Sequence, residues 1–65
     1  MNRFIVEYYF RIPYDDRRFL SHCGTVRCDA EGMHEAYAKV KEIANMFMNA
    51  VGGDSLRIES VRIEI

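Results

Sequence analysis

Four side chains with soft ligand atoms are the first candidates for chemistry in this chain: His22, Cys23, Cys28 and His34. Zinc sites usually take their ligands in pairs that are two to four residues apart, and neither the two cysteines nor the two histidines have that spacing. Cys23 and Cys28 also fall in one predicted strand, which sends their side chains to opposite faces, about 16 Å apart along it. A disulfide needs Cα atoms within about 7 Å. We therefore predict no metal, no cofactor and two free thiols, as is typical of a reducing compartment such as the cytoplasm.

Carboxylates and thiols are the next candidates, for catalysis. A catalytic cysteine needs a base beside it and a cleft that holds substrate, and a small sheet with one helix offers little concavity. Glu7 and Glu59 are candidate neighbours on the outer face of the predicted sheet. That face also carries arginines, so a lattice of surface ion pairs is favoured over an acid–base pair. We expect a protein that is not an enzyme.

Aromatic and cationic residues on the outer sheet face are the third candidates, because sheet platforms bind nucleic acid by stacking bases on aromatic rings between cations. Tyr9 is the stacking ring that the pattern places there. The tentative binding residues are Tyr9, Arg11, Arg27 and Arg57. Acidic residues on the same face cancel much of this charge, and no KGFGF-like run is present. A face that is solvated or covered by a partner is the competing interpretation.

The element that must position these residues is the stretch 3–12, RFIVEYYFRI. Its β-branched and aromatic residues predict a strand. Residues with even numbers form an entirely apolar face, whereas the other face mixes charges with Ile5 and Tyr9. The pattern is that of a central strand with its even face toward the core.

A second strand is predicted over 19–30, antiparallel to the first. Pro13 is expected to end the first strand, and residues 13–18 to form a loop in which the Asp pair supplies acceptors. The predicted register places Ile12 opposite Leu20 and Tyr8 opposite Gly24, which leaves room for the tyrosine ring. A shift by one residue would turn polar side chains toward the core.

A helix is predicted over 33–51, with the permissive Gly32 as its N-cap and residue 29 as the rival start. Its expected core stripe consists of Met33, Ala36, Tyr37, Val40, Ile43, Ala44, Phe47 and Val51. Met46 and Met48 widen its apolar surface, either as core margin or as a flexible contact for a partner. Gly52-Gly53 supplies a left-handed C-cap.

A third strand is predicted over 56–65. Its apolar residues change from even to odd numbers between Ile58 and Val61. A β-bulge at Glu59-Ser60 would keep both halves facing the core. The alternative is that one half turns its apolar side outward to a partner.

These elements predict one domain over residues 1–65 of the α+β class, with ββαβ order. A right-handed crossover from the second strand places the third beside the first, so the three-stranded antiparallel sheet has the order 2-1-3 with the helix packed on one face. The two edges of this sheet differ. Charges protect the third strand, whereas the stretch 21–26 of the second carries none, which predicts a homodimer through strand two. The alternative is a monomer in which strand two is short or is covered by the loop 13–18.

The composition limits the function further. The formal net charge of −1 creates no overall field for nucleic acid or an anionic membrane. No stretch approaches about 18 consecutive apolar residues, so we expect no membrane contact and a cytoplasmic location. A core of 65 residues only roughly offsets its ordering entropy, and burial against a second copy would add to it.

The ββαβ layout, including the join VRCDAEGMHEAYAKV from strand to helix, resembles small accessory proteins encoded by phages and mobile elements, among them some anti-CRISPR inhibitors. The resemblance extends over the chain and assigns no functional residue. It implies a protein that acts by occupying a surface of a larger host complex. The predicted function is thus a non-enzymatic protein-binding module, for which the resemblance implies the phage inhibitor or adaptor type, and the alternative is a nucleic-acid-binding module that uses the outer sheet face.

Overall fold

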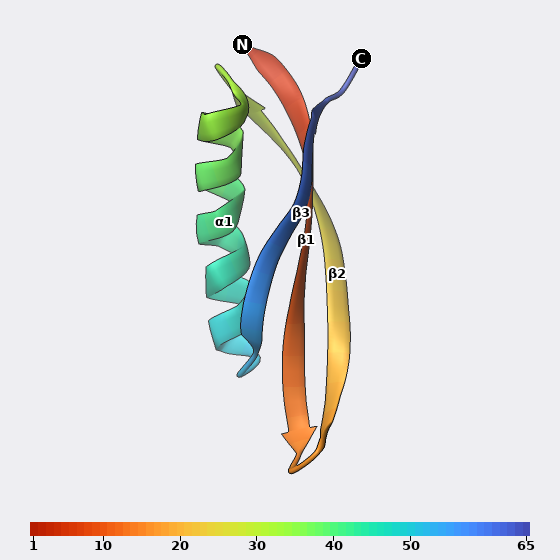
Figure 1. Cartoon of the computed structure of the whole chain (residues 1–65). Helices are drawn as coiled ribbons and strands as arrows, with labels where there is room; N and C mark the ends of the chain where they lie inside the picture. The colour runs from red at the N-terminus through yellow and green to blue at the C-terminus, as the bar shows by residue number, and fades with distance from the viewer.

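Three antiparallel strands and one helix form the fold in the computed structural model, which describes all 65 residues (Figure 1). The elements are β1 (Asn2–Asp15), β2 (Arg18–Ala30), α1 (Met33–Ala50) and β3 (Asp54–Ile63). The sheet has the order β2-β1-β3, and α1 packs on one of its faces. The predicted α+β class, the ββαβ layout and the central position of the first strand are confirmed.

The predicted register between β1 and β2 is also confirmed. Ile12 lies opposite Leu20, and Tyr8 lies opposite Gly24. At the far end of the pair Arg3 faces Asp29, where Nε of the arginine donates to the carboxylate at 3.3 Å. A one-residue shift would turn polar side chains of β2 toward the core, so burial of the apolar side chains of both strands selects this alignment.

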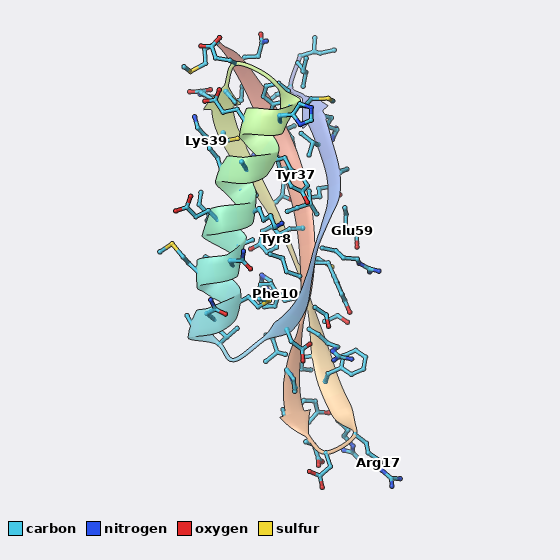
Figure 2. The ribbon with its side chains drawn as sticks, turned by 60° about the vertical axis from the view of Figure 1, so that its left-hand side comes forward. Tyr8, Phe10, Arg17, Tyr37, Lys39 and Glu59 are labelled. Carbon is cyan, nitrogen blue, oxygen red and sulfur yellow. The ribbon has the colours of Figure 1, made fainter.

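The core lies between the even-numbered face of β1 and a narrow strip of α1. Tyr8 and Phe10 occupy the space between helix and sheet in Figure 2. The helix contributes small or branched side chains, with Ala36, Val40 and Ala44 fully buried. Small residues let the helix backbone approach the sheet closely, so the large aromatic side chains of β1 fill most of the core volume.

The predicted loop over 13–18 is wrong, because β1 continues to Asp15 and β2 starts at Arg18. β3 begins at Asp54, opposite Arg11, so β1 has only one neighbour beyond this point. A proline is tolerated in such an edge segment because its missing N–H is not needed on the open side. The result is a hairpin arm that extends beyond the end of α1 (Figure 1).

The predicted core stripe of α1 is wrong in part. Only its central members are buried, and five of its eight residues are more than two-fifths exposed: Met33, Tyr37, Ile43, Phe47 and Val51. A sheet of three strands is too narrow to cover so wide a stripe, and the twisted sheet diverges from the end of the helix. Apolar side chains consequently remain exposed along both long sides of α1.

The ends of α1 follow the local sequence. Gly32 is the N-cap and makes no side-chain hydrogen bond, and the Glu35 carboxylate accepts instead from the backbone N–H of Glu31 at 3.2 Å. The rival start at residue 29 is not used. At the other end Gly52 adopts φ 69°, the left-handed conformation predicted for the C-cap.

The predicted bulge in β3 is confirmed. Glu7 pairs with Ser60 and Tyr8 with Ile58, so Glu59 is the extra residue. A second irregularity lies between Tyr9 and Arg11, and was not predicted. Its extra residues include Ser55, which has a φ of 61°.

The molecule is elongated, with principal dimensions of 44 × 18 × 13 Å. Its radius of gyration is 12.9 Å, whereas a compact domain of this length has about 11 Å. Its accessible surface of 4732 Å² also exceeds the roughly 4300 Å² expected for a monomer of this mass. The fold therefore leaves more surface in solvent than a compact chain of its size.

Candidate functional site

The outer face of the sheet brings together three of the four predicted binding residues. The guanidinium of Arg57 lies 4.9 Å from the centroid of the Tyr9 ring, on the neighbouring strand. Arg11 follows on the same face of β1, and the three line a shallow hollow of about 330 Å³. Its other lining residues are Phe19, Ser55 and Leu56.

Arg11 is held by a carboxylate at the start of β3. Its Nε donates to Oδ1 of Asp54 at 2.8 Å, and its Nη2 donates to Oδ2 at 3.3 Å. These hydrogen bonds, with the attraction between the two charges, lower the pKa of Asp54 and raise that of Arg11. A guanidinium bound in this bidentate way is already neutralised by its carboxylate, which weakens its attraction for a phosphate.

Arg27, the fourth predicted residue, lies apart from this hollow. It stands opposite Ile5, and its Nε donates to Glu64 at 3.3 Å. On the other side of Ile5, Arg62 pairs with Glu7 at 3.4 Å. Ile5 is only 8% exposed although it is on the outer face, which indicates that the neighbouring long side chains cover it.

The predicted ion-pair lattice is therefore present on this face. Glu7 and Glu59 do not face one another as an acid–base pair: Glu7 binds Arg62, and Glu59 lies 3.2 Å from Arg57. Each acid is paired with a different arginine. The face combines cations and anions in nearly equal number.

Phe19 belongs to the hollow but was absent from the sequence prediction. Its ring centroid lies 5.2 Å from the Arg11 guanidinium. The signal that could have found it is the register itself. Phe19 pairs with Pro13, so it shares the face of Arg11.

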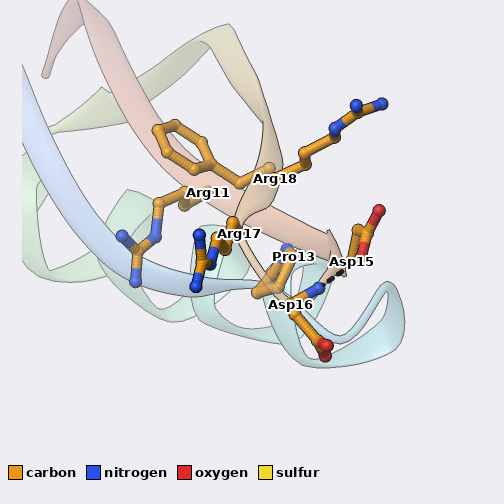
Figure 3. Close-up of a pocket in the computed structure, with 7 residues that line it drawn as sticks. Arg11, Pro13, Asp15, Asp16, Arg17 and Arg18 are labelled. Atoms are coloured by element: carbon orange, nitrogen blue, oxygen red, sulfur yellow. Dashed lines mark hydrogen bonds between the residues drawn. The ribbon is translucent and has the colours of Figure 1, made fainter.

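The tip of the hairpin forms a second hollow, of about 250 Å³ (Figure 3). Its turn is closed locally, since the Asp16 N–H donates to the Asp15 carboxylate at 2.6 Å. Arg17 and Arg18 follow, and neither has an ion-pair partner in the structure. All these side chains are exposed, and two acids balance the two cations.

A third hollow differs from the others in being apolar. It has a volume of about 450 Å³ and is lined by Met33, His34, Tyr37 and Val61. We call this the α1–β3 groove. Met33 and Tyr37 are one helical turn apart on α1, and Tyr37 points toward β3 in Figure 2. The sequence prediction missed it because it assigned both helix residues to the core.

The soft ligand atoms are dispersed. Cys23 is exposed on the outer face opposite Tyr9, whereas Cys28 is half-buried on the core side opposite Phe4. The His22 ring is half-buried, with Nε2 3.3 Å from the Tyr8 hydroxyl. No group of three or more His, Cys, Asp or Glu side chains lies close enough together to bind a metal ion.

Comparisons of the chain with protein-family models, curated proteins and solved structures find no match. No helix of the structure is both long enough and apolar enough to cross a membrane. The α1–β3 groove is the candidate site with the strongest apolar character, and the outer-face hollow is the candidate with the most charge.

Proposed function

We propose that this chain is a small, non-enzymatic protein-binding module whose α1–β3 groove receives apolar side chains of a partner protein. The observation that carries the proposal is the exposure of large apolar residues along α1, where Met33 is 53% and Tyr37 43% exposed. Exposed contiguous apolar surface with charged surroundings is typical of interaction sites.

The chemistry of the groove favours a protein as its occupant. A methionine and a tyrosine supply adaptable and amphipathic contact area, and both residue types are enriched at protein interfaces. Ile63 lies two residues beyond Val61, on the same side of β3, and is 50% exposed. The apolar surface therefore continues from the groove toward the end of the strand.

The layout-level resemblance to small phage accessory proteins extends the proposal to the kind of partner. A module of this type occupies a surface of a larger host complex, as an inhibitor or an adaptor. Free thiols at Cys23 and Cys28 suit action in the cytoplasm.

Ion pairing weakens the alternative, a nucleic-acid-binding function. Arg11, Arg27 and Arg57 each contact a carboxylate, so binding a phosphate would first break a pair. Nucleic-acid affinity comes mainly from cations that are free to displace counterions. The outer face offers few of these.

The test is affinity capture from a lysate of cells that encode the chain, with the immobilised wild type and two variants. Tyr37→Ser removes the ring that lines the groove, and Tyr14→Ser removes a comparably exposed tyrosine from the hairpin arm. We expect one protein to be retained in stoichiometric amount by the wild type and by Tyr14→Ser, and to be lost with Tyr37→Ser.

The captured protein must then bind the purified chain with the same dependence on Tyr37. Capture that Tyr37→Ser leaves unchanged would refute the role of the groove. The absence of any protein retained above the bead control would refute the binding function itself.

A further inference from the structure

We infer that two copies of this chain pair through their β2 edges, in antiparallel orientation, to form one continuous six-stranded sheet with both helices on the same face. This association uses the side of the molecule opposite the α1–β3 groove. It is therefore independent of the partner proposed above.

The first observation is the unprotected edge of the sheet. β2 has 13 residues and a single neighbour, β1. Between Ser21 and Val26 it contains no charged residue and no proline, and its side chains are small or half-buried. Natural sheets usually protect a long edge with charges, bulges or a covering element. The other edge strand, β3, has both a bulge and charged residues at 57, 59 and 62.

The second observation is an apolar strip of α1 that lies on the β2 side. Lys39 defines this side, because its Nζ donates to the backbone oxygen of Asp29 at the end of β2, at 2.9 Å. Ile43 and Met46 follow Lys39 at helical spacing and share its side of the helix. They are 45% and 67% exposed.

β2 adds an exposed apolar side chain beyond the end of α1. Leu20 pairs with Ile12, which packs against the core, and is 57% exposed on the same face of the sheet as α1. Helix and strand thus present apolar side chains on one face of the sheet, beside the open edge. A monomer has no element that covers them.

Symmetry decides how two such edges combine. Identical strands that pair antiparallel in one sheet are related by a two-fold axis perpendicular to the sheet, so both helices lie on one face. Adjacent strands are about 4.8 Å apart, which separates the two β1 strands by about 14 Å. Helices in contact have axes about 8 to 10 Å apart. Side chains as large as Ile43 and Met46, contributed by both copies, suit the space between helices that lie over their own sheets.

The pairing also restricts the register. Residues that face each other across the new edge must lie on the same face, so their numbers are both even or both odd. With the axis near the middle of β2, the pairing centres on Cys23 or on Gly24. In the first case the two Cys23 residues are directly opposite, and in the second they are diagonal neighbours, about 7 to 8 Å apart. The two Cys28 residues are far from the axis in both cases.

Sedimentation equilibrium at micromolar concentration is the first measurement, and a species of twice the 7.6 kDa chain mass is expected. Ile43→Ser should raise the dissociation constant at least about tenfold, since the apolar side chain is lost from both copies. Met33→Ser is the matched control, because it is similarly exposed but lies in the α1–β3 groove. It should leave the constant unchanged.

Cross-linking is the second measurement, and it reports the edge itself. Mild oxidation, or a short bis-maleimide, should join two copies of a Cys28→Ser variant through Cys23, and should not join two copies of Cys23→Ser. A further variant, Thr25→Lys, places like charges near the axis while leaving a side chain that can pair with Glu7 on β1. It should remain folded by circular dichroism and become monomeric.

Three results would overturn the inference. These are a 7.6 kDa species in the micromolar range, a dimer that Met33→Ser weakens as much as Ile43→Ser, and a dimer whose Cys23 residues do not cross-link. A failure of this kind would leave the capture experiment on Tyr37 intact, because the two surfaces lie on opposite sides of α1.

Discussion

The ring of Tyr8 occupies the space above Gly24, on the neighbouring strand, where a Cβ on residue 24 would overlap it. Tyr8 is only 6% exposed and packs against Phe10, with ring centroids 6.0 Å apart. The ring therefore has little freedom to move aside. Gly24 is required here for space, not for an unusual backbone conformation.

We predict that Gly24→Ala lowers the free energy of unfolding by about 1 to 3 kcal/mol, the usual cost of overpacking a core. Urea denaturation measures it. In the background Tyr8→Leu, which lacks the overlapping atoms, the same change should cost much less. Equal costs in the two backgrounds would show that the ring and residue 24 do not compete for space.

Val6 is fully buried on the core face of β1, and Glu7 is its neighbour on the outer face. Val6→Asp places an unpaired charge in the core at a cost of about 4 kcal/mol or more, enough to unfold a domain of this size. Glu7→Gln removes one exposed ion pair, worth about 1 kcal/mol at most. Circular dichroism at increasing temperature gives the melting temperatures of the two variants. Similar melting temperatures would contradict the assignment of the two faces.

Acid should destabilise the fold through two carboxylates. Hydrogen bonds from Arg11 to Asp54 and from Lys39 to Glu35 hold both pKa values below their ordinary 3.8 and 4.5. The unfolded chain therefore binds these protons at a higher pH than the folded chain does. The stabilisation from these two pairs is complete at pH values above the ordinary pKa values. It is lost as the pH falls through the lowered pKa values of the folded chain.

The measurement is the midpoint of urea unfolding between about pH 5 and about pH 3, where we expect a steady decrease. The double variant Asp54→Asn, Glu35→Gln should show a shallower decrease. Its control is Asp16→Asn, Glu42→Gln, which removes two carboxylates that have no ion-pair partner in the structure. If the urea midpoint of the control variant decreases as little with falling pH as that of the test variant, the assignment to these two pairs is contradicted.

Nucleic acid should bind weakly or not at all. We expect no retention of a mixed-sequence oligonucleotide by micromolar wild type at about 50 mM salt, because the outer-face arginines are already paired. Fluorescence anisotropy of a labelled oligonucleotide measures this binding. Salt-sensitive binding that the double variant Tyr9→Ala, Arg11→Glu abolishes would instead establish the outer face as a nucleic-acid site.

The alternation of β1 was enough to predict which face of the sheet is buried, because it places Phe4, Val6 and Phe10 on one face. The bulge at Glu59 was predictable for the same reason, since the apolar residues of β3 change phase there. The alternation of apolar and polar residues is informative wherever burial decides which of the two faces of a strand points to the core.

The extent of the elements was less predictable. Pro13 ends a strand only where both sides need hydrogen bonds, and the sequence does not reveal that β3 stops short of it. The exposure of Tyr37 and Phe47 depends on the width and twist of the sheet, which are tertiary properties. The α1–β3 groove could not be foreseen because its residues have the same periodicity as a core.

Among the predicted site residues, the odd residue numbers of Tyr9, Arg11 and Arg57 correctly predicted that all three lie on the outer face. The alternation of side chains gives the face of a residue but not its position along the sheet. Arg27 was therefore grouped with them, although it lies near the other end of the sheet, opposite Ile5. The carboxylate partner of Arg11, Asp54, follows from the pairing of β1 with β3, whose register depends on its irregularities.

The central position of β1 sets the order in which the fold can be completed. Its pairing with β2 needs only a tight turn, and hairpins of this kind form within microseconds. Its pairing with β3 joins Phe4 to Ile63, so one side of the first strand stays open until the last strand has been synthesised. On the ribosome, β1 and β2 therefore wait as an incomplete sheet, and chain elongation, not hairpin closure, limits the time to the native state.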